Sequence, residues 1–129
     1  MNEQELKDRT KRFGLRAMRP VRALPKGEEG RIIGRQLLRA ATSVGANYRA
    51  ACRGRSKAEF VAKLGTVEEE ADESAFWLEL IVESGLMKGT RVKALQQEAD
   101  ELVAIVCASR KSASSRRGQS KISNRKSKM

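Results

Sequence analysis

Residues 32–60 read IIGRQLLRAATSVGANYRAACRGRSKAEF and contain the end of one helical pattern, a break and the start of another. Gly54 marks the break, because glycine tolerates the positive φ at which many helices end. Ser56 and Glu59 then form a capping box, in which Ser56 accepts a hydrogen bond from the amide of Glu59 and Glu59 accepts one from the amide of Ser56. Before the break, apolar residues recur every three or four positions and share one helix face, namely Ile33, Leu37, Ala40 or Ala41, Val44, Tyr48 and Ala51.

The same periodicity extends in both directions and predicts helices at about residues 3–22, 28–53, 57–84 and 90–111. The first has apolar positions at Leu6, Phe13, Ala17 and Val21. The last two alternate steps of four and three, the heptad pattern of bundles, at Phe60, Leu64, Val67, Ala71, Ser74, Leu78 and Ile81 and at Val92, Leu95, Ala99, Leu102, Val106 and Ser109. Short connections between such helices predict an all-α, antiparallel up-and-down four-helix bundle over residues 1–111.

From residue 112 onward the chain is mostly serine, lysine and arginine. Such a segment cannot bury enough apolar surface to offset the entropy lost on ordering. We therefore predict a disordered basic tail over residues 112–129.

Two motifs in the central stretch resemble the four-helix-bundle family of 23S rRNA-intervening sequence proteins. The resemblance covers about residues 13–111, and it departs from the family at Ala50, where many members carry glutamate. It implies a four-helix bundle, an association with rRNA and a ring-forming homo-oligomer, commonly a pentamer. Related bundle proteins assist diversity-generating reverse transcriptases. The motifs are Gln36-x-x-Arg39-Ala40-Ala41-x-Ser43-Val44-x-x-Asn47 and Arg55-Ser56-Lys57-x-Glu59-Phe60.

The net charge of +11 is unevenly distributed along the chain. Residues 1–57 carry +10, residues 58–109 carry −7 and residues 110–129 carry +8. This division indicates two opposed surfaces, which attract each other between subunits or leave the basic one to face a polyanion. The alternative is that the charges are only the solvated faces of the helices. The candidate phosphate contacts are two rows of arginines at helical spacing and a pair in the tail, namely Arg9, Arg12, Arg16 and Arg19, then Arg31, Arg35 and Arg39, then Arg116 and Arg117.

Composition argues against an enzyme. The chain has no histidine, the commonest general base and metal ligand. Cys52 has no identifiable activating base, and the clustered carboxylates at residues 68–73 point to different sides of a helix. The glycines at 27, 30 and 34 follow no strand and precede no Gly-Lys-Ser/Thr, so they do not form a phosphate loop. We expect no cofactor and no bound metal.

The sequence therefore favours a cytoplasmic, non-enzymatic RNA-binding protein that forms a homo-oligomer. No apolar run approaches the length of a membrane span and the N-terminus does not resemble a signal peptide, so we expect no membrane partner. Only 4 % of residues are aromatic, which favours contacts to the RNA backbone over readout of stacked bases. The alternative is an assembly module that binds a partner protein such as a reverse transcriptase.

Overall fold

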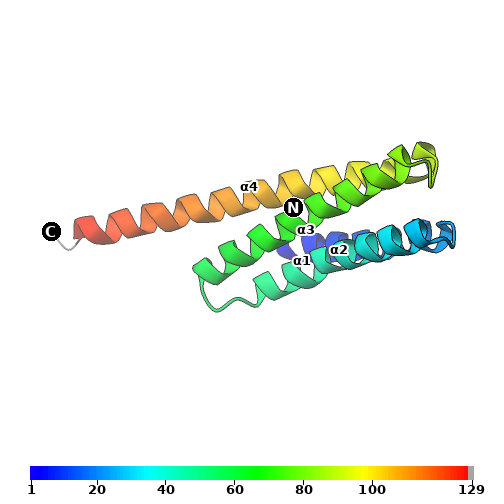
Figure 1. Ribbon diagram of the computed structural model, residues 1–129. Helices are drawn as coiled ribbons and strands as arrows, with labels where there is room; N and C mark the ends of the chain where they lie inside the picture. The colour runs from blue at the N-terminus through cyan, green and yellow to red at the C-terminus, as the bar shows by residue number, and fades with distance from the viewer. Residues whose placement is uncertain (128–129) are drawn as a thin grey trace.

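The computed structural model describes the backbone of residues 1–127 and the side chains of residues 1–115. Within that part the chain forms four helices, α1 (Glu3–Ala23), α2 (Glu28–Cys52), α3 (Lys57–Glu83) and α4 (Gly89–Ser127). Consecutive helices run antiparallel and pack against each other, and α1 closes the bundle more loosely against α4 (Figure 1). The predicted up-and-down four-helix bundle is confirmed.

The corner between α2 and α3 lies where the sequence predicts it, with two differences in detail. Ser56 caps α3 by accepting a hydrogen bond from the amide of Glu59 at 3.1 Å. The Glu59 carboxylate accepts from the amide of Arg55 at 2.7 Å, one residue earlier than predicted. Gly54 does not have a positive φ. It is required for space, because a Cβ there would lie 3.1 Å from the carbonyl oxygen of Ala51.

The end of α3 does use a positive φ, at Gly85 (79°). The amide of Gly85 donates to the carbonyl of Val82, and the amide of Leu86 donates to that of Ile81, both at 3.1 Å. This pair of bonds is a Schellman motif, which satisfies the last carbonyls of the helix. The next helix begins at Gly89, one residue before its predicted start, and Thr90 lies in its first turn.

The core is made of the predicted apolar positions. The interior positions of all four stripes are buried. Val21, Ile33 and Phe60, which lie near helix ends, are half-buried, as is Ser109, which follows the last buried residue in the described part of α4. Two polar residues are also buried. Thr10 donates to the carbonyl of Leu6, and Ser74 to that of Glu70, each at 2.8 Å, so neither hydroxyl is left unpaired.

Glycine allows α1 and α2 to approach closely. A Cβ on Gly45 would lie 3.2 Å from backbone atoms of Thr10 and Lys11, and one on Gly14 would lie 3.3 Å from the Cα of Thr42. Gly65 has no such role, because the nearest atom to a Cβ there is the Arg110 Cδ at 3.9 Å. Gly14 and Gly45 therefore allow these two helices to come together, at a cost of about 1 kcal/mol each in helix propensity.

The fourth helix continues past its predicted end near residue 111 and projects beyond the other three helices (Figure 1). Its last buried residue in the described part is Val106, so the core ends before the basic tail begins. The side chains of residues 116–129 lie outside the described part of the structure. The division into a bundle of residues 1–111 and a disordered tail stays a prediction.

Candidate nucleic-acid interface

The predicted arginine row on α1 begins with a residue that is paired inside the bundle. Arg9 donates to both carboxylate oxygens of Glu98 on α4, at 2.6 and 2.7 Å, and to Glu101 at 3.1 Å. The hydrogen bond from Arg9 lowers the pKa of Glu98 below its ordinary value. Arg9 therefore fastens the first helix to the last and is not available to a phosphate.

The last arginine of the α2 row is also paired. Arg39 forms salt bridges with Glu70, at 3.4 Å, and with Glu73, both on α3. A third pair between helices joins Arg110 of α4 to Glu68 of α3 at 2.8 Å, and the hydrogen bond from Arg110 lowers the pKa of Glu68. Part of the charge division along the sequence is thus balanced within one chain. Arg9 and Arg39, which were predicted to contact phosphates, are therefore paired with carboxylates of α4 and α3.

The other predicted residues differ in exposure. Arg16 is half-buried on α1. Four arginines are exposed: Arg12 and Arg19 of α1 and Arg31 and Arg35 of α2. No carboxylate among the described residues lies within 4 Å of their charged groups. Arg116 and Arg117 lie outside the residues whose side chains are described.

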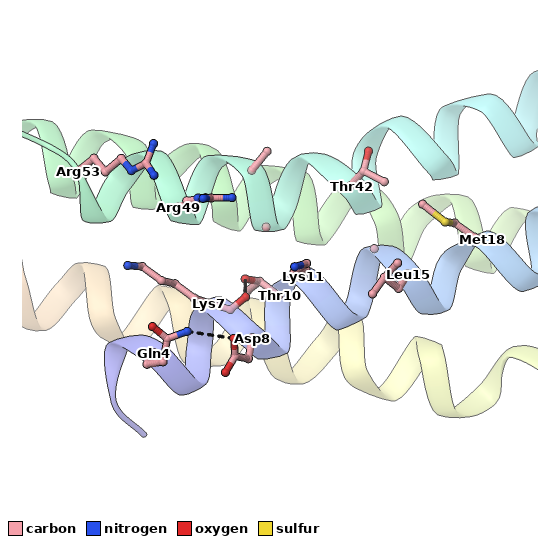
Figure 2. Close-up of a pocket in the computed structure, with 13 residues that line it drawn as sticks. Gln4, Lys7, Asp8, Thr10, Lys11, Leu15, Met18, Thr42, Arg49 and Arg53 are labelled. Carbon is pink, nitrogen blue, oxygen red and sulfur yellow. Dashed lines mark hydrogen bonds between the residues drawn. The ribbon is translucent and has the colours of Figure 1, made fainter.

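A groove of about 510 Å³ lies between α1 and α2 on the outside of the bundle. Its middle includes Gly14 and Gly45, where the two backbones come closest. Figure 2 shows cationic side chains from both helices at one end and Leu15, Met18 and Thr42 at the other. The cations are Lys7, Lys11, Arg49 and Arg53.

The charge at the cationic end of the groove is not fully balanced. Lys7 pairs with Glu3 at 3.3 Å, and Asp8 accepts a hydrogen bond from Gln4 at 3.0 Å. Lys11, Arg49 and Arg53 are exposed, and within residues 1–115 none of them forms a salt bridge. This end of the groove therefore offers a positive potential to an anionic ligand.

These four cations were not predicted as contacts for an anionic ligand. The predicted rows are the longest runs of arginine at helical spacing. However, Arg9 of the first row pairs with a carboxylate of α4, and Arg39 of the second row pairs with carboxylates of α3. The groove cations are two residues on each helix, four positions apart, at Lys7 and Lys11 and at Arg49 and Arg53. In the sequence, Gly14 and Gly45 were the residues that could have indicated a groove between α1 and α2.

Other features of the described residues bear on the class of site. Burial raises the pKa of Cys52, which keeps this thiol protonated and a poor nucleophile. No group of three or more potential metal ligands is found in the part of the chain that the structure describes. None of the helices there has an apolar stretch long enough to cross a membrane.

The fold and the surface define a small helical-bundle protein whose first two helices carry exposed cations. The chain belongs to the family of 23S rRNA-intervening sequence proteins, whose family model matches residues 2–108. It is similar to a protein of unknown function from the S23 ribosomal protein family of Bacteroides thetaiotaomicron, known from a crystal structure. The two are 27 % identical, the match covers 86 % of this chain and 99 % of that one, and the TM-score is 0.79. No curated protein matches the chain significantly.

Proposed function

We propose that this chain is a non-enzymatic, cytoplasmic RNA-binding protein that acts as a homo-oligomer. The observation that carries the proposal is the set of exposed cations on α1 and α2 without carboxylate partners, which includes Arg12, Arg19, Arg31 and Arg35. Phosphates neutralised by such cations release counterions, and this release supplies most of the affinity for a nucleic-acid backbone.

The family description supports RNA as the polyanion. The family is described by the intervening sequence of 23S rRNA, and the Bacteroides protein belongs to a ribosomal protein family. We therefore propose rRNA or another structured RNA as the partner. The absence of histidine and the protonated state of Cys52 support a role without catalysis.

The test is RNA binding over a salt series. Replacing Arg12, Arg19, Arg31 and Arg35 by Gln should lower the slope of log affinity against log salt by about 0.7 to 0.9 for each phosphate contact that is lost. The loss should be similar for RNAs of different sequence, because backbone contacts carry no sequence information. If the intact protein does not bind RNA at low salt, the proposal is wrong.

The matched control removes four cations from outside α1 and α2. Lys63, Lys88, Arg91 and Lys93 are exposed residues of α3, α4 and the connection between them. Their replacement by Gln changes the net charge equally. A salt slope that falls as much as in the first variant would mean that net charge alone, and no particular surface, attracts the RNA.

A second candidate function is protein assembly, and an apolar surface on α2 and α3 favours it. Ile32 is 54 % exposed and Phe76 is 50 % exposed, and the ring of Phe76 meets that of Trp77 edge-on at 5.0 Å. The Trp77 Nε1 is buried and has no hydrogen-bond partner among the described residues. Exposed aromatic residues of this kind are enriched where proteins associate.

The register of α2 and α3 brings these residues to one place. Arg39 pairs with Glu73 across the two antiparallel helices. Two helical turns span about seven residues. Ile32 therefore lies two turns before Arg39 on α2, and Phe76 lies about one turn after Glu73 on α3. Because the helices are antiparallel, both residues lie on the same side of the Arg39–Glu73 pair along the bundle. We propose this surface for contact between subunits of the oligomer, for which the family resemblance implies a pentamer. A reverse transcriptase or another partner protein is the alternative occupant.

A further inference from the structure

We infer that the groove between α1 and α2 binds a single strand of RNA, with its phosphates at the cationic end and a nucleotide base or ribose against the apolar end. This inference rests on the proposed RNA binding and names the site and the form of RNA. It differs from the predicted rows of arginine, because Lys11, Arg49 and Arg53 belong to neither row.

The width of the groove favours a single strand. Gly14 and Gly45 allow the backbones of α1 and α2 to approach until an added Cβ would lie 3.2 to 3.3 Å from the opposite helix. The axes of packed helices lie about 8–10 Å apart. A depression between two such helices admits one strand, whereas a duplex would rest on its rim.

The length of the groove fits a short oligonucleotide. Its lining on α1 extends from Gln4 to Met18, which is about 21 Å at about 1.5 Å per residue. A stacked strand carries one phosphate per about 3.4 Å, so about six nucleotides span this distance. Lys11 on one side and Arg49 and Arg53 on the other would flank such a strand.

The apolar end supplies the second part of the site. Leu15 is 55 % exposed. Together with Met18 it forms an apolar wall facing Thr42 of α2 (Figure 2). A base or ribose can cover this wall while its phosphate remains near the cations. Contacts of this kind do not depend on the base, so we expect little sequence preference.

The experiment measures the affinity of the full chain for single-stranded hexauridylate and for an RNA hairpin duplex over a salt series. Replacing Lys11, Arg49 and Arg53 by Gln should weaken hexauridylate binding at least tenfold. It should also lower the salt slope by about 2, since each contact to a single strand contributes about 0.7. The matched control, with Lys63, Lys88 and Lys93 replaced by Gln, should retain the affinity of the intact protein within about twofold.

A second variant blocks the groove without changing any charge. Ala46 is exposed on α2 and lines the groove, so Ala46→Trp should fill it and weaken hexauridylate binding at least fivefold. Ala104→Trp, at an exposed position of α4, should not. If RNA is attracted only by the overall charge of the protein, both tryptophan variants should bind hexauridylate as tightly as the intact protein. That result would overturn the inference.

The remaining outcomes separate this inference from the proposed function. If the groove and control triple variants lose affinity equally, or if the protein binds the hairpin but not hexauridylate, the groove is not the site and RNA binding by another surface stands. If the intact protein binds neither RNA, both the proposed function and this inference are wrong.

Discussion

Arg9 of α1 donates two hydrogen bonds to the carboxylate of Glu98 on α4 and so joins the first and last helices of the bundle across 89 residues of sequence. The pair is partly buried, with 25 % of the Arg9 side chain and 12 % of the Glu98 side chain exposed. Because α1 meets α4 less extensively than any other pair of adjacent helices, this pair has a large share in closing the bundle.

The first prediction concerns this pair. Glu98→Gln should lower the free energy of unfolding by about 1.5 kcal/mol, the lower end for a hydrogen bond to a charged group. The pKa of Glu98 is lowered in the folded protein. Its contribution is therefore present above the unfolded pKa of about 4.3 and is lost as the pH falls through the lower folded value.

Urea unfolding at several pH values measures this effect. Wild type and Glu98→Gln should differ most above about pH 5 and should converge only as the pH falls through the folded pKa of Glu98, which lies below the unfolded value of about 4.3. The control is Asp100→Asn, at an exposed carboxylate of α4 that forms no salt bridge within the described residues. A difference between wild type and Glu98→Gln that stays constant from pH 7 to pH 3 would contradict the assigned role.

The second prediction concerns the corner between α2 and α3. Ser56→Ala removes the oxygen that accepts from the amide of Glu59, and it should lower the free energy of unfolding by about 1 kcal/mol. Ser56→Asp retains an acceptor at this position and should restore most of the loss. Equal midpoints of chemical unfolding for Ser56→Ala and wild type would show that the cap is not formed in solution.

The third prediction compares two glycines inside helices. Gly65→Ala should stabilise the protein by up to about 1 kcal/mol, because alanine favours the helix and the new methyl group meets little. Gly45→Ala should not gain this energy and should destabilise the bundle, since its Cβ would lie 3.2 Å from the backbone of α1. Thermal unfolding followed by circular dichroism compares the two, and similar midpoints would refute the close contact.

The fourth prediction tests the apolar surface of α2 and α3. The intact protein should be an oligomer at micromolar concentration, and the double variant Ile32→Ser and Phe76→Ser should dissociate. Leu15→Ser is the control, because Leu15 is equally exposed but lies in the groove between α1 and α2. Light scattering gives the masses. A monomeric wild type, or dissociation by Leu15→Ser alone, would exclude this surface as the subunit contact.

The fifth prediction concerns the tail. Deleting residues 112–129 should weaken RNA binding and leave the unfolding midpoint nearly unchanged, because the described core ends at Val106. A chain of full length with the tail lysines and arginines replaced by Gln should lose as much affinity as the deletion. If the deletion lowers the midpoint by several degrees, the tail contributes to the fold and is not merely a cationic segment.

Periodicity alone was sufficient for the fold. Each helix buries one stripe, and a repeat of three to four residues can be read without knowing what the stripe packs against. This is why Leu37, Val67 and Leu102 could be assigned to the core. The capping serine could be located because Ser56 and Glu59 stand three residues apart. These signals are local, since each depends on residues only a few positions apart.

The surface was predictable only in part, because pairing between helices depends on register. Whether Arg9 and Arg39 are free or paired depends on which acids of α3 and α4 lie opposite, and nothing near them in the sequence carries that information. The groove likewise exists because Gly14 and Gly45 allow two helices to approach. The sequence by itself determined the number of helices, the serine cap of α3 and the buried stripes, because these arise from contacts within one or two turns. The tertiary structure decided which cations remain exposed and where they gather, because electrostatic pairing depends on distances between residues that are far apart in the chain.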